Sequence, residues 1–391
     1  MNQFKWPLMV NNITTQDMQV VIDFLKTNPI LTQSTQVATF EQEWSNWLGV
    51  KHSVLLNSGS SANILTFSVL KVLYGTGEVI VGPLGWVSDI VALLINGFKP
   101  VFVDINPRTL CIDENQVLSR INSNTKAVLL IHVQGFNGLS DRLLNTLKER
   151  NIPLIEDACE SHGATFKGQK VGSFGLISNF SFYFAHHMST IEGGMVCTND
   201  EKIFQIARMF RSHGMTREMT DNEIKAKYKN NHQDLNPDFI FAYPGFNMRN
   251  TEIGAVLGRN QLHRLDKNNE KRSGNFKLFL ENLDSTKYQT DFALEGSSNY
   301  AFNLIAKRPD KEFFKKVMQA LRENGIEFRR GSAGGGNQMR QPYLKDIIPQ
   351  NDFSHFPCVE HVHFFGMYIG NYPDLYEDRI IFLYNLLNNI N

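Results

Sequence analysis

The stretch HSVLLNSGSSANILTFSVLKVLYG, residues 52–75, shows how this chain is built. Residues 52–57 form a short apolar run typical of a buried strand, and residues 60–75 have the length and apolar spacing of a helix. The same order recurs in EVIVGP (78–83) before SDIVALLINGF (88–98), and in TKAVLLIHVQG (125–135) before DRLLNTLKERN (141–151). Such alternation with near-continuous apolar strands predicts an α/β fold whose mostly parallel sheet is covered by helices on both faces.

The pattern changes beyond about residue 200. Residues 215–245 are polar and weakly periodic, which predicts an excursion or loop. After residue 250 a helical stretch precedes further strands and helices, which predicts a smaller α+β domain. We therefore expect an N-terminal segment (1–30) packing on the small domain, a large domain (31–248) and a small C-terminal domain (249–391).

The composition limits the possible partners and location. Lys+Arg and Asp+Glu number 39 each, so bulk electrostatics do not favour a nucleic acid or an anionic membrane. The N-terminus does not resemble a signal peptide, and no apolar run is long enough to span a bilayer. The four cysteines are scattered without a C-x-x-C pair, which favours reduced thiols over disulfides, a zinc site or an iron–sulfur cluster. We expect a cytoplasmic protein without a metal.

Polar clusters follow several predicted strands, where parallel sheets bind their ligands. Residues 57–61 form a Gly/Ser turn at a helix start, which can bind an anion or can serve as an ordinary serine N-cap. Asp157 follows a buried strand and could pair with a protonated ring nitrogen of a cofactor, or could cap a helix or join an ion pair. Trp86 lies at another strand end, as a stacking platform or as a core residue.

In their order along the chain, these pieces resemble the DegT/DnrJ/EryC1/StrS aminotransferases, fold-type I pyridoxal phosphate enzymes that modify nucleotide-linked sugars. The matching motifs cover roughly residues 30–270: NSGSSAN, PLGWVSD, KPVFVDI, IEDACESHGATFKGQKVGSFG, FSFYFAHHMSTIEGGMV, RSHG and GFNMRNTEIGAVLG. The resemblance implies an aspartate aminotransferase-like fold. It also implies a homodimer with shared active sites, in which Asn247 of one subunit approaches the cofactor phosphate of the other.

The resemblance further implies individual cofactor contacts. Gly59, Ser60 and Ser181 would form the phosphate cup, Trp86 would stack on the cofactor ring, and Asp157 would pair with the pyridinium nitrogen. Family members usually read S-F-x-P-x-K at the next strand end, where the lysine binds the cofactor covalently. Here the stretch is SFYFAH (181–186), so the lysine position holds His186.

A histidine cannot bind pyridoxal phosphate covalently as that lysine does, so we expect non-covalent pyridoxal and pyridoxamine phosphate. With an unperturbed pKa near 6.5, His186 is suited to proton transfer at neutral pH, and we expect the adjacent His187 to shape the turn. Glu160 is a second departure, since the family's aminotransferases usually carry glutamine there.

The exchange of lysine for histidine resembles a small subgroup of 3-dehydratases that act on 4-keto-6-deoxy sugars. The resemblance implies GDP-4-keto-6-deoxy-D-mannose as substrate, L-glutamate as amino donor, and a place in the biosynthesis of dideoxysugars such as colitose of lipopolysaccharide O-antigens. A related subgroup acts on a CDP-linked sugar with a [2Fe–2S] cluster, for which the scattered cysteines offer no ligand set. A CDP-linked substrate, a nucleotide-sugar 4-aminotransferase and a non-catalytic binding protein remain the alternatives.

Three further residues are candidates for substrate binding. Arg329 and Arg330 precede a triple-glycine loop in FRRGSAGGGNQMRQ (328–341), and arginines suit a sugar-nucleotide diphosphate. The alternative is a solvated basic loop. His213, from RSHG, is expected to face the site of the partner subunit.

Overall fold

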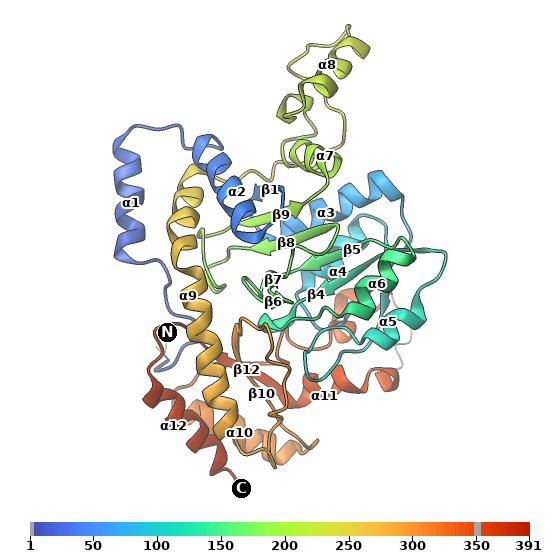
Figure 1. Cartoon of the computed structure of the whole chain (residues 1–391). Helices are drawn as coiled ribbons and strands as arrows, with labels where there is room; N and C mark the ends of the chain where they lie inside the picture. Colours follow the sequence, from blue (N-terminus) through green and yellow to red (C-terminus); the bar gives the residue numbers. More distant parts are fainter. Residues whose placement is uncertain (1–3, 348–352) are drawn as a thin grey trace.

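The computed structural model describes residues 4–347 and 353–391, with a seven-stranded sheet at its centre (Figure 1). The strand order is β1-β9-β8-β5-β4-β2-β3. β2, β3, β4, β5 and β8 pair in parallel, whereas β9 is antiparallel to both β1 and β8. The predicted α/β fold with a mostly parallel sheet is confirmed. Its strands are β1 (His52–Leu56), β2 (Glu78–Val81), β3 (Lys99–Phe102), β4 (Thr125–Ile131), β5 (Leu154–Asp157), β8 (Ile177–Ser181) and β9 (Gly194–Thr198).

Both faces of the sheet are covered, as alternate residues of β8 show. On one face Asn179 accepts a hydrogen bond from Thr66 of α3 (Gly59–Tyr74). On the other face Phe180 meets Trp44 of α2 (Thr35–Leu48), with ring centroids 5.0 Å apart. Every residue of β8 is buried, although Ser178, Asn179 and Ser181 are polar. The other helices beside the sheet are α4 (Val87–Ile95), α5 (Glu114–Arg120), α6 (Asp141–Glu149) and α7 (Glu201–Arg211).

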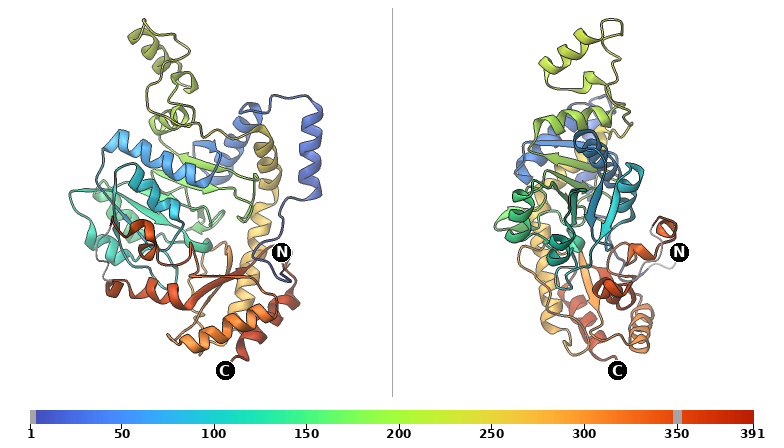
Figure 2. Two further views of the ribbon diagram at one scale, coloured as in Figure 1. Left: turned by 180° about the vertical axis from the view of Figure 1, so that it is seen from behind. Right: turned by 90° about the vertical axis from the view of Figure 1, so that its right-hand side faces the viewer.

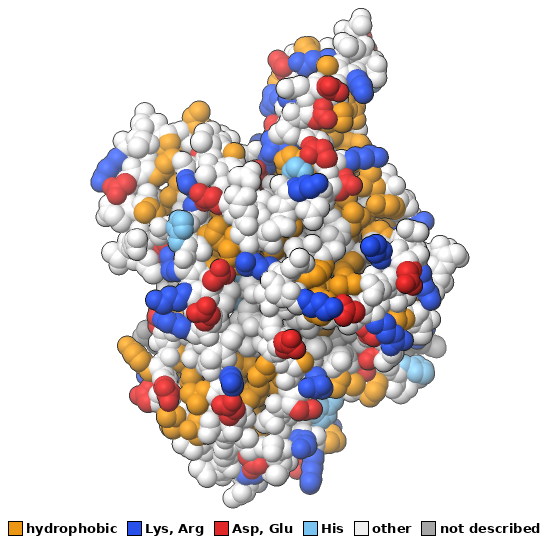
Figure 3. All heavy atoms as spheres, in the orientation of Figure 1, with side chains coloured by type: hydrophobic (Ala, Val, Ile, Leu, Met, Phe, Trp, Pro, Cys, Tyr) orange, Lys and Arg blue, Asp and Glu red, His pale blue; other side chains and the backbone are white. Residues whose placement is uncertain are grey.

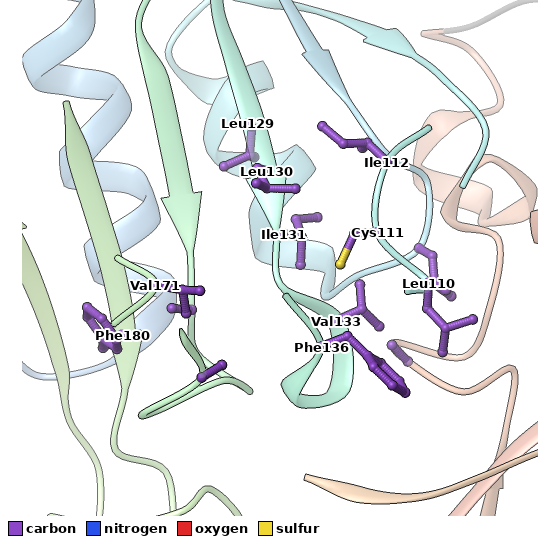
Figure 4. Packing of buried hydrophobic residues seen from close by; sticks show 14 of the residues in the cluster. Leu110, Cys111, Ile112, Leu129, Leu130, Ile131, Val133, Phe136, Val171 and Phe180 are labelled. Atoms are coloured by element: carbon purple, nitrogen blue, oxygen red, sulfur yellow. The ribbon is translucent and has the colours of Figure 1, made fainter. Parts of the chain in front are cut away.

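The core is continuous beneath the carboxyl end of β4. Figure 4 shows Leu129, Leu130 and Ile131 of this strand beside Val133 and Phe136, which follow it. The thiol of Cys111 lies in the same apolar packing, because residues 110–112 run alongside.

A smaller antiparallel sheet lies at the other end of the molecule, with the order β10-β12-β11 (Figure 1). α9 (Glu252–Asn282) is 31 residues long and runs from α2 to this sheet. α9 contacts α2, which covers the large sheet, and β10 of the small sheet, and the domain boundaries expected at residues 30 and 248 stay predictions. The elements of this part are β10 (Ala301–Ile305), α10 (Lys311–Glu323), β11 (Phe328–Arg330), α11 (Pro357–Phe365), β12 (Gly366–Gly370) and α12 (Glu377–Asn388).

The N-terminal segment contacts both parts of the molecule. Trp6 places its ring edge against Phe302 of β10, and its Nε1 donates to the carbonyl of Gly370 at 2.9 Å. Farther along, α1 (Thr15–Lys26) lies beside the first half of α9 (Figure 1). The segment therefore runs from the small sheet to the elements that cover the large one.

Residues 215–245 project from the body, as Figures 1 and 2 show. This predicted excursion contains a helix, α8 (Asn222–Asn231), which buries none of its residues and is capped by the Asp221 side chain. Phe239 and Phe241 follow it and are more than half exposed, at 52% and 56%. The short remaining elements are η1 (Val133–Gly135), β6 (Thr165–Phe166), β7 (Gln169–Lys170), η2 (Thr216–Glu218), η3 (Gln338–Arg340), η4 (Pro342–Leu344) and η5 (Phe353–His355).

The surface is mixed in charge. On the face drawn in Figure 3, Lys and Arg side chains are interspersed with Asp and Glu. Within residues 4–347 and 353–391, no helix combines the length and the apolar character that crossing a bilayer requires.

Candidate active site

The predicted phosphate cup is assembled from two distant parts of the chain. Gly59 is the first residue of α3, and Ser58 caps the helix by accepting from the backbone N–H of Ser61. A Cβ built on Gly59 would lie 2.6 Å from Cβ of Ser181 and 3.2 Å from Sγ of Cys159. The backbone of α3 thus touches the end of β8 at a point where no side chain fits. The first N–H groups of a helix have no intrahelical acceptor and suit an anion; Ser60, half-buried, is the second residue of α3.

Asp157 is the last residue of β5 and is 4% exposed. Its Oδ1 accepts from the backbone N–H of Cys159 at 2.9 Å. Opposite it in the sheet is Asn179, two residues before Ser181 at the end of β8. The carboxylate therefore lies at the edge of the sheet where the cup is formed.

A second carboxyl, which the sequence reasoning missed, is buried beside it. Asp89 is 2% exposed and shares a hydrogen bond with Asp157. Burial, followed by the charge of Asp157, raises the pKa of Asp89 well above its ordinary value. Burial thus favours the protonated form of Asp89, in which the carboxyl can donate a hydrogen bond. The available signal was its spacing, since Asp89 stands three residues after Trp86 in a capping-box position.

Trp86 is exposed although it is large and apolar. It is the N-cap of α4, and 61% of its surface is accessible. Its backbone N–H donates to Oδ2 of Asp89 at 2.9 Å. The alternative of a core tryptophan is therefore wrong, and the ring is open to a planar ligand.

His186 stands in the connection between β8 and β9, within a cluster of rings. Its centroid is 5.8 Å from that of Tyr300 and 6.2 Å from that of His162. His187 is buried behind it, stacks on His162 at 5.3 Å, and its Nε2 lies 3.1 Å from the carbonyl of Ser298. The two adjacent histidines therefore have different places, one half-buried and one in the core.

Burial keeps this cluster uncharged. It lowers the pKa of His186 to about 4, opposed by the charge of Asp157 and assisted by the guanidinium of Arg272. Burial likewise lowers the pKa of His162 and His187 well below the ordinary value. The pKa of His186 thus lies below the unperturbed value near 6.5, because of desolvation that a sequence does not reveal. At neutral pH the imidazole is a neutral proton acceptor.

Glu160 has the opposite shift. Its Oε2 accepts from the backbone N–H of Gln134 at 3.0 Å. Burial, with a contribution from the charge of Asp157, raises the pKa of Glu160 to about 7. The site thus contains one group poised as a base and one that holds its proton near neutrality.

A pH profile tests the role of Glu160. A protonated Glu160 offers a donor where family aminotransferases carry glutamine, so we expect kcat/KM to fall above pH 7, by roughly tenfold per pH unit. Glu160→Gln keeps a donor that cannot titrate, and its profile should stay flat above pH 7. In both proteins the acid limb should lie near pH 4, where His186 becomes charged. An unchanged decline above pH 7 in Glu160→Gln would exclude this assignment.

The two candidate arginines lie on β11 and are exposed. Arg329 forms an ion pair with Glu327 at 3.0 Å and pairs across the sheet with Tyr368, whose ring approaches that of Tyr300 at 6.4 Å. Arg329 is therefore the cross-strand neighbour of a tyrosine that borders the ring cluster around His186. Arg330, the next residue, lies on the opposite face of the strand.

The triple-glycine loop packs against the segment that carries Trp86. A Cβ on Gly334 would lie 1.8 Å from the carbonyl oxygen of Gly85, and the φ of Gly334 is +53°. Gln338 reinforces this contact, because its Nε2 donates to the same carbonyl at 3.2 Å. A side chain at Gly334 would separate the small sheet from the segment before Trp86.

Asn247 and His213 lie next to each other at the base of the projecting segment. Asn247 pairs with Ser212, and the backbone N–H of His213 donates to the carbonyl of Phe246 at 2.5 Å. Both side chains are exposed. Within the single chain the structure records no contact between them and His186, Asp157 or Trp86.

The four cysteines are free. In the described part of the chain, no group of three His, Cys, Asp or Glu side chains is placed to hold a metal ion.

The α/β architecture, with these residues at the strand ends, is that of the fold-type I pyridoxal phosphate enzymes. The model of the DegT/DnrJ/EryC1/StrS aminotransferase family matches residues 11–372, and the chain belongs to that family. The GDP-4-keto-6-deoxy-D-mannose 3-dehydratase of Yersinia pseudotuberculosis is 30% identical to it over 392 residues, which cover 98% of each protein.

Two solved structures of GDP-4-keto-6-deoxymannose-3-dehydratase are also similar, each 27% identical to this chain. A variant with bound GDP-perosamine has a TM-score of 0.85, over 98% of this chain and 100% of that one. A structure with a trapped PLP-glutamate geminal diamine has a TM-score of 0.87, over the same shares of the two chains.

Proposed function

We propose that this protein removes the C3 hydroxyl of GDP-4-keto-6-deoxy-D-mannose with pyridoxamine phosphate as cofactor and L-glutamate as amino donor. The observation that carries the proposal is His186, a neutral imidazole where related aminotransferases have a lysine, in a site whose other parts are retained. The GDP-linked substrate and glutamate are supported by the relatives.

The residues present fit this cofactor. The contact between Gly59 and Ser181 leaves a backbone-lined cup without room for a Cβ, Asp157 is buried at the end of β5, and Trp86 is exposed. We assign the phosphate to Gly59, Ser60 and Ser181, the ring nitrogen to Asp157, and the ring face to Trp86, with Glu160 as a further polar contact. When bound, the cofactor supplies an electron sink next to the sugar's C4 carbon.

His186 moves the protons of the reaction. As a neutral base it accepts one proton, and the resulting imidazolium has strong acidity because burial opposes its charge. It then returns a proton to the departing C3 hydroxyl oxygen, which leaves as water. One residue thus acts as base and as acid, without a covalent bond to the cofactor.

The overall reaction balances. The sugar loses one oxygen atom, and glutamate becomes 2-oxoglutarate and ammonia, so glutamate supplies the two electrons that the deoxygenation requires.

The polar face around Arg329 is the proposed contact of the diphosphate. We propose a homodimer in which Asn247 and His213 of each subunit approach the site of the other, since both are exposed in the single chain.

Stoichiometric ammonia release tests the function. The holoenzyme is incubated with GDP-4-keto-6-deoxymannose and glutamate, and ammonia and 2-oxoglutarate are measured together. We expect one ammonia for each 2-oxoglutarate. A 4-aminotransferase would give 2-oxoglutarate without ammonia, and a binding protein would give neither. A parallel reaction with the CDP-linked sugar decides the nucleotide.

Borohydride reduction tests the cofactor linkage. Because position 186 holds no primary amine, reduction of the resting holoenzyme should leave no pyridoxyl adduct on an active-site peptide. The matched control is His186→Lys, which restores an amine at the same position and should be labelled and lose dehydration activity. A pyridoxyl-lysine in the wild-type active site would contradict the proposal. Peptide mass spectrometry provides the measurement.

A further inference from the structure

The turn that carries His186 has no covalent attachment to fix it. The backbone N–H of His186 donates to the carbonyl of Tyr183 at 3.0 Å, which closes a tight turn. In the part of the chain that the structure describes, Nδ1 of His186 is buried and has no hydrogen-bond partner. The neighbouring rings contact the imidazole, but among the described residues no hydrogen bond to Nδ1 orients it, so its position also depends on the backbone that bears it.

That backbone is held by a residue from the N-terminal segment. Nδ2 of Asn12 lies 3.2 Å from the carbonyl oxygen of Phe184 and 3.3 Å from that of His186. An amide group with two N–H bonds can serve two acceptors, one on either side of Ala185. We call this pair of hydrogen bonds the Asn12 clasp.

Asn12 is itself fixed to α9. Nη2 of Arg264 donates to the carbonyl of Asn12 at 3.0 Å, and the same guanidinium binds both oxygens of Asp17. Asp17 is fully buried and also accepts from Asn260 at 2.6 Å. Forked, charge-assisted bonds of this kind are strong and directional. The N-terminal segment is thus joined to α9 at the point where it meets the turn.

The far end of the turn is joined to the same helix. Gln261 of α9 accepts from the backbone N–H of Ser189 and donates to its carbonyl, both at 2.9 Å. One end of residues 184–189 is therefore held directly by α9, and the other end is held through Asn12 and Arg264. Between these two attachments stand His186 and His187.

We propose that Asn12 is a positioning residue for His186. Its amide holds the carbonyls of Phe184 and His186, so that the imidazole keeps its place without the covalent bond that a lysine would form with the cofactor. This role rests on the proposed function, because it assumes that His186 transfers protons. The clasp itself does not depend on that assumption.

The test uses the cofactor-loaded full chain with Asn12→Ala and Asn12→Asp, the second of which preserves size but removes the donor. Hydrogen–deuterium exchange of the peptide covering residues 183–189 should become faster in both variants. A shift of about 1 Å at a reacting group can cost about 100-fold, so we expect kcat to fall by roughly 10- to 100-fold, with KM and cofactor affinity nearly unchanged. The control is Gln19→Ala, which removes an exposed amide of α1 that donates to Asp23 and should alter neither measurement.

The exchange and kinetic measurements test the clasp and the positioning role separately. Unchanged exchange in both Asn12 variants would overturn the clasp. Faster exchange with an unchanged kcat would overturn the positioning role. A wild-type protein without dehydratase activity would instead overturn the proposed function, and the exchange measurement would still judge the clasp independently.

Discussion

His186→Asn is expected to lower kcat for dehydration by about 10⁴-fold. A positioned acid–base group typically contributes about 10²–10⁴-fold, and here one imidazole serves two proton transfers. Asparagine is polar and of similar shape, but it cannot accept and return a proton. The loss should therefore appear in kcat, measured by product formation under saturating substrate, while absorbance titration shows unchanged cofactor affinity.

The neighbouring histidine provides the control. His187 is buried, and its Nε2 contacts the carbonyl of Ser298, a bond that an asparagine amide can replace. His187→Asn should consequently keep most of the turnover. Near-normal activity in His186→Asn together with a collapse in His187→Asn would transfer the role of base to the second histidine.

Arg211→Met is expected to destabilise the folded protein by about 3–5 kcal/mol, because it leaves a carboxylate buried without its main partner. Arg211 is 0% exposed, and its Nη1 lies 2.5 Å from Oε1 of Glu41 and 3.1 Å from the carbonyl of Leu55. The next cation, Arg208, is 3.7 Å from the other oxygen of Glu41. Chemical denaturation of the holoprotein provides the measurement.

This pair also contacts the strand that leads into the turn at 57–61, since Glu41 accepts from the backbone N–H of Leu55 in β1. Arg142→Met is the matched control, because Arg142 is 59% exposed in its pair with Glu114. An exposed pair typically contributes less than about 1 kcal/mol. Equal losses in the two variants would show that burial does not determine the cost.

The alternation of apolar runs and helical patterns predicted the fold class, because strands that are buried on both faces consist mainly of apolar residues. The direction of β9 was not predicted. Its sequence, GMVCT, is as apolar as that of a parallel strand, and only the connection from Ser181 to Gly194 reveals the reversal. That connection contains no helix, whereas a parallel crossover usually contains one.

Site residues could be predicted where a reactive residue type stands in a recognisable motif at the end of a predicted strand. Asp157 and His186 stand at strand ends that the pattern located, and the structure places them in one site with Trp86 and the Gly59 turn. The partners that tune them come from elsewhere: Asp89 from α4 and Asn12 from the N-terminal segment. A sequence does not state which distant side chains meet, nor how deeply they are desolvated, so the low pKa of His186 could not be predicted.

The central claim is that the C3 oxygen leaves while no nitrogen stays on the sugar. Mass spectrometry of the sugar nucleotide formed by the holoenzyme from GDP-4-keto-6-deoxymannose and glutamate measures both at once. We predict a product that is one oxygen atom lighter than the substrate and contains no added nitrogen. A product in which an amino group replaces the C4 ketone and the C3 hydroxyl remains would contradict the account.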